Sequence, residues 1–164
     1  MCANVISKVL EINNCNKGDL VKALYKAEFW EKIKPTKKLE AEFRTPNVLY
    51  TKVYDEVNVI KIPVEMEGEL VLEDKGEQDE KGRLIEFNVR NNKDVKELDG
   101  RIRIKEITSL TSKLGVFIES FKLSSDFMNI IGKSAAELVL RTKITDMVRN
   151  LQNFCKNNSL RELK

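Results

Sequence analysis

Residues 60–72 read IKIPVEMEGELVL, and apolar and polar side chains alternate along them. Apart from Gly68, every even position from Ile60 to Leu72 is apolar, while charged residues hold most of the odd positions. A period of two over this length predicts a β-strand with one dry face. At about 3.4 Å per residue the strand would span about 40 Å. It therefore needs an equally long element to cover it.

Six other segments have the composition and spacing of strands, and turn-forming residues separate them. They are residues 2–12, 38–44, 48–54, 85–89, 98–105 and 112–123, with a polar hairpin loop over 73–82. The last segment is apolar on both faces near Phe117, which is typical of a central strand. Pro63 cannot donate a ladder hydrogen bond, so we expect either a bulge there or a displaced strand boundary.

Helical spacing occurs in two parts of the chain. Residues 19–35 predict two short helices or one broken helix that ends at Pro35. Residues 126–157 predict one long helix of about 45 Å, capped by Ser124 or Ser125. Gly132 inside that helix would cost about 1 kcal/mol relative to alanine, which indicates close packing, a slight kink or space at a pocket mouth. We expect a single domain over 1–157 and a frayed tail over 158–164.

Composition excludes several classes of chemistry. The chain has 164 residues, no histidine and a formal charge of +3 that is spread over mixed positions. The absence of histidine excludes histidine-dependent triads and histidine metal sites. Three cysteines without a C-x-x-C pair favour a reducing compartment, so we expect a cytoplasmic protein. No membrane span, metal or cofactor signature is visible, and nucleic acid is not an expected partner.

The order of these elements resembles the helix-grip fold of the START and Bet v 1-like superfamily. The helical insertion DLVKALYKAEFWEKIKP, residues 19–35, between the first two strands is its most particular feature. The resemblance implies an α+β fold in which a curved, seven-stranded antiparallel sheet wraps around the C-terminal helix. It also implies an apolar cavity for a greasy ligand, sometimes with catalysis added. Some small archaeal members resemble fatty-acid carriers, and this Lys-, Ile- and Glu-rich sequence is similar to them.

The inward faces of the strands and of the long helix predict the lining of that cavity. The apolar candidates are Ile62, Val64, Met66, Phe87, Ile102, Ile104, Phe117, Phe121, Phe127, Ile131, Ala135 and Leu138. For each of them, plain core packing is the alternative. Candidate polar contacts to a ligand are Tyr50, Tyr54, Glu119 and Arg141. Glu119 interrupts an apolar phase, so it either contacts the ligand or lies at the wet rim of the sheet.

Three functions fit these features. The first is a non-enzymatic carrier of a hydrophobic small molecule, a long-chain fatty acid or related lipid, because this needs an apolar cavity and no catalytic constellation. The second is an enzyme of the polyketide cyclase or aromatase kind, which needs buried acid–base groups. The third is a protein-interaction module, similar to the helix-grip domain that stimulates a chaperone, which predicts a filled core and an exposed apolar patch. The sequence leaves the oligomeric state open.

Overall fold

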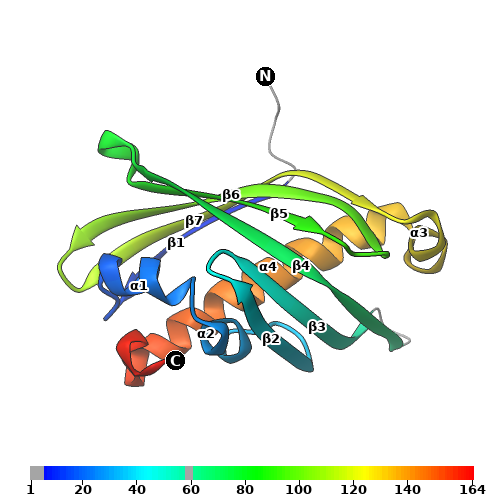
Figure 1. The fold of residues 1–164 in the computed structure, drawn as a ribbon, viewed down its shortest axis with the longest axis horizontal. Coiled ribbons are helices and arrows are strands. Elements are labelled where there is room, and N and C mark those ends of the chain that lie inside the picture. Colours follow the sequence, from blue (N-terminus) through cyan, green and yellow to red (C-terminus); the bar gives the residue numbers. More distant parts are fainter. Residues whose placement is uncertain (1–5, 58–60) are drawn as a thin grey trace.

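The computed structural model describes residues 6–57 and 61–164 (Figure 1). The expected strand residues Cys2 to Val5, and Ile60 of the opening segment, lie outside this range. The strands are β1 (Ile6–Asn13), β2 (Lys38–Thr45), β3 (Val48–Val57), β4 (Ile62–Glu77), β5 (Arg83–Arg90), β6 (Val95–Thr108) and β7 (Thr111–Leu123). The helices are α1 (Lys17–Ala23), α2 (Ala27–Lys32), α3 (Ser125–Ile131) and α4 (Lys133–Asn157), with short 3₁₀ turns at Asp79–Lys81 and Leu160–Glu162.

The seven strands form one antiparallel sheet in the order β1-β7-β6-β5-β4-β3-β2. The sheet is open, with β1 and β2 as its edges, and it curves around α4 (Figure 1). Helices α1 and α2 separate β1 from β2 in the chain and join the first strand of the sheet to the opposite edge. This arrangement confirms the predicted α+β helix-grip architecture.

Strand β4 continues beyond its predicted end at Leu72 and includes part of the predicted hairpin loop. It continues to Glu77, and its pairing with β5 passes an irregularity between Asp74 and Gly76. Arg83 on β5 donates two hydrogen bonds to the Asp74 carboxylate, and this guanidinium holds the pKa of Asp74 below its usual value. Residues 73–77 have the composition of a polar loop. The cross-strand ion pair between Asp74 and Arg83 stabilises them as part of the strand.

Pro63 is explained by the displaced strand boundary, the second of the two alternatives expected from the sequence: β4 begins at Ile62, and Lys61 lies in a turn. The β3–β4 register runs through the Glu56–Pro63 pair without a shift, so no bulge forms there. The ladder between β4 and β5 begins only at Glu69. Pro63 thus lies where β4 has a neighbour on one side, and such an edge position tolerates a missing backbone donor.

The predicted long helix is two helices, and Gly132 lies between them. Ser124 caps α3 as predicted, by accepting a hydrogen bond from the Phe127 amide at 3.2 Å. Gly132 then has φ 88° and ψ 148°, in a region that is nearly restricted to glycine, and α4 starts at Lys133. The prediction of one continuous helix from 126 to 157 is therefore wrong, since Gly132 breaks the helix instead of kinking it.

The C-terminal half of α4 covers a filled core. Four of its side chains, Ile144, Val148, Leu151 and Cys155, are buried against α1, α2 and the sheet. Asn150 on the same helix donates hydrogen bonds to the carbonyls of Ile33 and Lys34, which ties the segment after α2 to the helix. The side chains of α1 and α2 fill most of this half of the molecule and leave a small cavity of about 30 Å³ beside Trp30 and Leu151, whereas a cavity of about 180 Å³ lies towards α3.

Cys15 and Cys155 lie together in this packed half as free thiols. The hydrogen bond between their side chains, together with burial, raises the pKa of Cys15. We expect both thiols to resist alkylation in the native protein, because the thiolate is the reactive species and both groups are buried. Per-residue labelling with iodoacetamide at pH 8, with the urea-unfolded protein as control, measures this. Native labelling of Cys15 as fast as in urea would contradict the packing described.

Residues 158–164 pack on the domain, so the prediction of a frayed tail is wrong. Leu160 and Leu163 are buried, and the Arg161 guanidinium pairs with Asp19 of α1 at 3.0 Å. The amide of Glu28 also donates to the carbonyl of Lys164 at 3.4 Å. Two leucines close to the end of a mostly polar segment bury enough apolar surface to order it.

Leu160→Ala should lower the free energy of unfolding by about 2–4 kcal/mol, because it leaves a cavity under α1. Arg161→Ala is the matched control, since its side chain is 75% exposed and an exposed ion pair contributes about 0–1 kcal/mol. Urea unfolding of both variants measures the difference. Equal effects of the two substitutions would mean that the tail is not packed.

Candidate functional site: an apolar cavity with one ion pair

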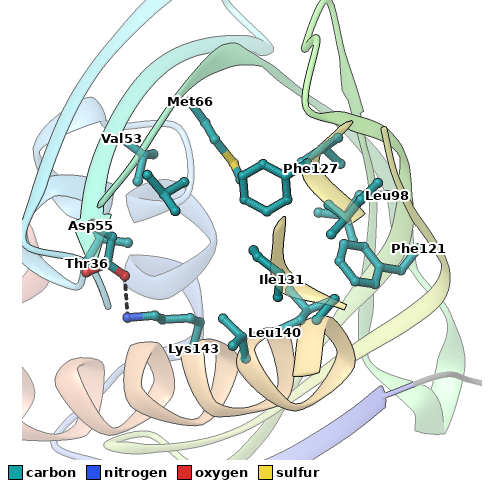
Figure 2. A pocket seen from close by; sticks show the side chains of 15 residues that line it. Thr36, Val53, Asp55, Met66, Leu98, Phe121, Phe127, Ile131, Leu140 and Lys143 are labelled. Carbon is teal, nitrogen blue, oxygen red and sulfur yellow. Dashed lines mark ion pairs between the residues drawn. The ribbon is translucent and has the colours of Figure 1, made fainter. Parts of the chain in front are cut away.

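A cavity of about 180 Å³ lies between the sheet, α3 and the first half of α4 (Figure 2). Its lining combines the ends of several strands with both helices. The apolar lining residues are Val53, Val64, Met66, Val95, Leu98, Phe121, Leu123, Phe127, Ile131, Ala136, Val139 and Leu140, and the polar ones are Thr36, Asp55 and Lys143. A mostly apolar wall with a few polar groups is typical of sites that bind small organic molecules.

Strand register places the wall on β3 and β4. Val53 pairs with Met66 and Asp55 pairs with Val64, so these four side chains share the face that looks toward α4. This is the dry face predicted from the alternation in residues 60–72. The opposite wall comes from Phe127 and Ile131 on α3 and from Leu140 on α4 (Figure 2).

The polar groups of the cavity gather at one side of it. Lys143 forms an ion pair with Asp55 and donates a hydrogen bond to the carbonyl of Pro35 at 3.0 Å. Asp55 is only 6% exposed, and the Lys143 side chain is 27% exposed. Thr36 completes this side, and its hydroxyl donates to the carbonyl of Lys38 at 3.1 Å. Phe121 and Leu98 lie across the cavity from the ion pair (Figure 2).

Five predicted lining residues line this cavity, namely Val64, Met66, Phe121, Phe127 and Ile131. Ile102 and Ile104 are buried in the packed core, and Phe87 packs against it. Ile62 opens β4 outside the lining. Ala135 and Leu138 are also outside it, and Leu138 is 63% exposed. The break at Gly132 explains the last two, because it shifts the inward face of α4 by one residue, from 135 and 138 to 136 and 139.

Phe117 lies on the outer face of the sheet, contrary to the prediction. Ile118 pairs with Gly100 and Ser120 pairs with Asp99, so Glu119 is an extra residue in β7. A bulge of this kind reverses which residues face inward, since side chains alternate along a strand. Phe121 therefore faces the cavity, whereas Phe117 stacks under the Arg101 guanidinium at 4.9 Å. Two phenylalanines four residues apart occupy opposite faces.

None of the four predicted polar contacts lines the cavity. Tyr50 and Tyr54 occupy the outward positions of β3, and the hydrogen bond from Tyr50 to Glu67 raises the pKa of Tyr50. Glu119 pairs with Arg101 on the outer face of the sheet. Arg141 is exposed on α4.

Three polar residues of the cavity, Asp55, Lys143 and Thr36, are absent from the candidates that the sequence suggests. Asp55 looks like part of the turn after residues 48–54, although it continues the inward phase of Leu49, Thr51 and Val53. A carboxylate at an inward, apolar position of a strand needs a partner. The alternation along β3 therefore already marks Asp55 as a candidate in the sequence. Lys143 has a comparable signal, since it lies four residues after Val139 and four before Met147 and so interrupts the apolar stripe of the helix.

Neither a metal-binding cluster nor a membrane-spanning helix occurs in residues 6–57 and 61–164. Within these ranges, no three cysteine, aspartate or glutamate side chains come together in a way that could hold a metal ion. None of the helices described there is long and apolar enough to cross a membrane.

Comparison with solved structures finds the same fold in several proteins. A START superfamily protein from Mycobacterium smegmatis superposes with a TM-score of 0.68 at 11% identity, over 92% of this chain and 96% of that one. A protein from Thermus thermophilus gives 0.65 at 10% identity, over 92% and 95%. The Zhui aromatase/cyclase from Streptomyces sp. R1128 gives 0.57 at 14% identity, over 96% and 91%. No family model and no curated protein matches the sequence. At these identities the likeness concerns the fold alone.

Proposed function

We propose that this chain, which has the helix-grip fold of the START superfamily, binds and carries a hydrophobic small molecule in the cavity between its sheet and its two C-terminal helices. The observation that carries the proposal is the cavity itself, whose wall is apolar on all sides except at Asp55, Lys143 and Thr36. Such a space lowers the stability of the free protein, because side chains around it lack packing contacts, and a bound apolar ligand would restore those contacts.

The proposed ligand is a fatty acid or a related single-chain lipid. An engineered cavity of about 150 Å³ in another protein admits benzene, so a volume of about 180 Å³ encloses a ring or a chain segment. The rest of a long chain would extend past α3 or require α3 to move. Affinity should then rise by about fourfold per methylene while the cavity fills, and level off for longer chains.

A polyketide cyclase or aromatase activity is the second candidate. A buried carboxylate beside an amine in the cavity favours it, because acid–base chemistry needs such groups in contact with the ligand. Proteins described as aromatase/cyclases are among the structural neighbours. The interaction-module alternative has less support, since it predicts a filled core. We retain carriage without chemistry as the proposal, and recovery of a chemically unchanged ligand would support it.

We also propose the cellular compartment in which the protein acts. Free, buried thiols at Cys15 and Cys155 suit a reducing cytoplasm. A nucleic-acid partner is not proposed, since the charges are mixed along the chain. The similarity to small archaeal carriers stays a prediction.

The test combines identification and titration. Native mass spectrometry and lipid extraction of the purified protein identify any ligand that copurifies, and saturated fatty acids from six to sixteen carbons are then titrated by NMR. We expect saturable one-to-one binding that strengthens with chain length and then levels off. Absence of saturable binding for every chain length, both of these fatty acids and of the alcohols of the same lengths, would contradict the proposal.

A further inference from the structure

We propose that the Asp55–Lys143 ion pair receives the polar end of the ligand and that this end is uncharged, a hydroxyl or a carbonyl. The inference rests on the proposed function and narrows its ligand from fatty acids and related lipids to the related lipids with an uncharged polar end, while ionised fatty acids bind more weakly, through their chain. The cavity should then discriminate between charged and uncharged headgroups on the same apolar chain, which binding of the chain alone would not do.

The Asp55–Lys143 ion pair gives the cavity one polar side. Lys143 and Asp55 stand on one side of the cavity, and the side chains across from them are apolar (Figure 2). A ligand with one polar end and one apolar end has a single favourable orientation in such a site, because a polar group placed against the apolar wall would lose its hydrogen bonds to water. Its polar end thus lies at Lys143 and its apolar end toward Phe121.

The ion pair keeps hydrogen-bonding capacity for a ligand. An ammonium group has three N–H donors, and Lys143 uses one toward Asp55 and one toward the carbonyl of Pro35. The third is available to an oxygen of the ligand. Among the described residues, the structure gives the Asp55 carboxylate one partner, Lys143, through Oδ2. Its Oδ1 therefore has room to accept a hydrogen bond from a ligand hydroxyl.

The charge of the ion pair determines which polar group of a ligand it favours. The pair is neutral as a unit, so an ionised carboxylate placed there would face the Asp55 charge and leave a net negative charge in a largely buried space. A hydroxyl or a carbonyl adds no charge and uses the same donor. The pair therefore selects against the ionised form of a fatty acid, and favours alcohols, ketones and phenols of similar size.

The experiment compares 1-octanol with octanoate at pH 8, where octanoate is ionised, by NMR titration of the wild type and two variants. Asp55→Asn keeps the shape of the side chain and removes the charge that opposes a carboxylate. Glu56→Gln is the matched control, because it makes the same change of charge at the next residue, where Glu56 pairs with Lys37 outside the cavity at 2.9 Å.

We expect Asp55→Asn to tighten octanoate binding at least about 10-fold and not to tighten octanol binding, since the group that accepts the octanol hydroxyl loses its charge, while Glu56→Gln changes neither. Equal octanoate affinity in the two variants would overturn the inference and leave the carrier function standing. If neither compound binds the wild type, the carrier function fails, and the inference fails with it.

A second measurement needs no variant. In the wild-type complex with 1-octanol, intermolecular NOEs should connect the carbinol CH₂ to the Lys143 side chain and the terminal methyl to the Phe121 ring. The reverse orientation, or a ligand that contacts neither residue, would overturn the inference even if Asp55→Asn fails to fold.

Discussion

Replacement of Ile131 by glutamate is expected to lower the affinity for the chain-length series at least about 100-fold. The side chain of Ile131 points into the cavity from the last turn of α3 (Figure 2). A carboxylate there must either stay charged against apolar walls or displace α3, and each costs several kcal/mol, while about 2.7 kcal/mol already corresponds to about 100-fold. NMR titration with dodecanoate and with 1-octanol measures the loss.

Phe117→Glu is the matched control for this variant. The same glutamate on the outer face of the sheet lies beside Arg101, so we expect unchanged affinity for both ligands. A loss of binding in Phe117→Glu together with retained binding in Ile131→Glu would contradict the placement of the bulge at Glu119 and of the cavity. Circular dichroism of both variants shows whether each keeps its fold.

Gly100→Val is expected to destabilise the protein by at least about 3 kcal/mol. A Cβ at this position would lie 2.4 Å from the carbonyl oxygen of Phe117 and 2.6 Å from Cζ of Phe87. The oxygen belongs to the neighbouring strand β7, directly beside the bulge, so the backbone cannot move away without loss of ladder hydrogen bonds. For a domain of this size such a loss corresponds to a fall of roughly 6–12 °C in Tm.

Gly76→Ala provides the comparison for Gly100→Val. Nothing lies within 4 Å of a Cβ at Gly76, but its φ is 83°, so alanine there should cost only about 1–2 kcal/mol of backbone strain. Urea unfolding of both variants separates a steric clash from a conformational penalty. A smaller effect at Gly100 than at Gly76 would mean that β6 and β7 do not approach as closely as described.

The architecture was predictable because it depends on patterns that repeat over many residues. The alternation in residues 60–72 and the helical stripe after Ser124 survive errors of one or two positions, since each is supported by many side chains. The turn residues between strands gave the order of the elements. For the same reason the predicted fold class and its resemblance to the helix-grip fold agree with the structure.

The site was less predictable because it depends on single residues that change the phase of a pattern. The bulge at Glu119 reverses the facing of β7, and the break at Gly132 shifts the inward face of α4. Neither event leaves a periodic trace in the sequence, so periodicity alone puts Phe117, Ala135 and Leu138 in the cavity. Asp55, in contrast, was predictable. The alternation along β3 places its side chain on the inward face, together with Leu49, Thr51 and Val53.

Binding in the cavity is tested most directly by a methyl-resolved ¹H–¹³C NMR titration of the wild-type protein with 1-octanol and dodecanoate. We expect saturable shifts at Val53, Val64, Ile131 and Leu140, with Val148 and Leu151 in the packed half unchanged. Shifts centred on Val148 and Leu151, or no saturable shift with either compound, would contradict ligand binding in this cavity.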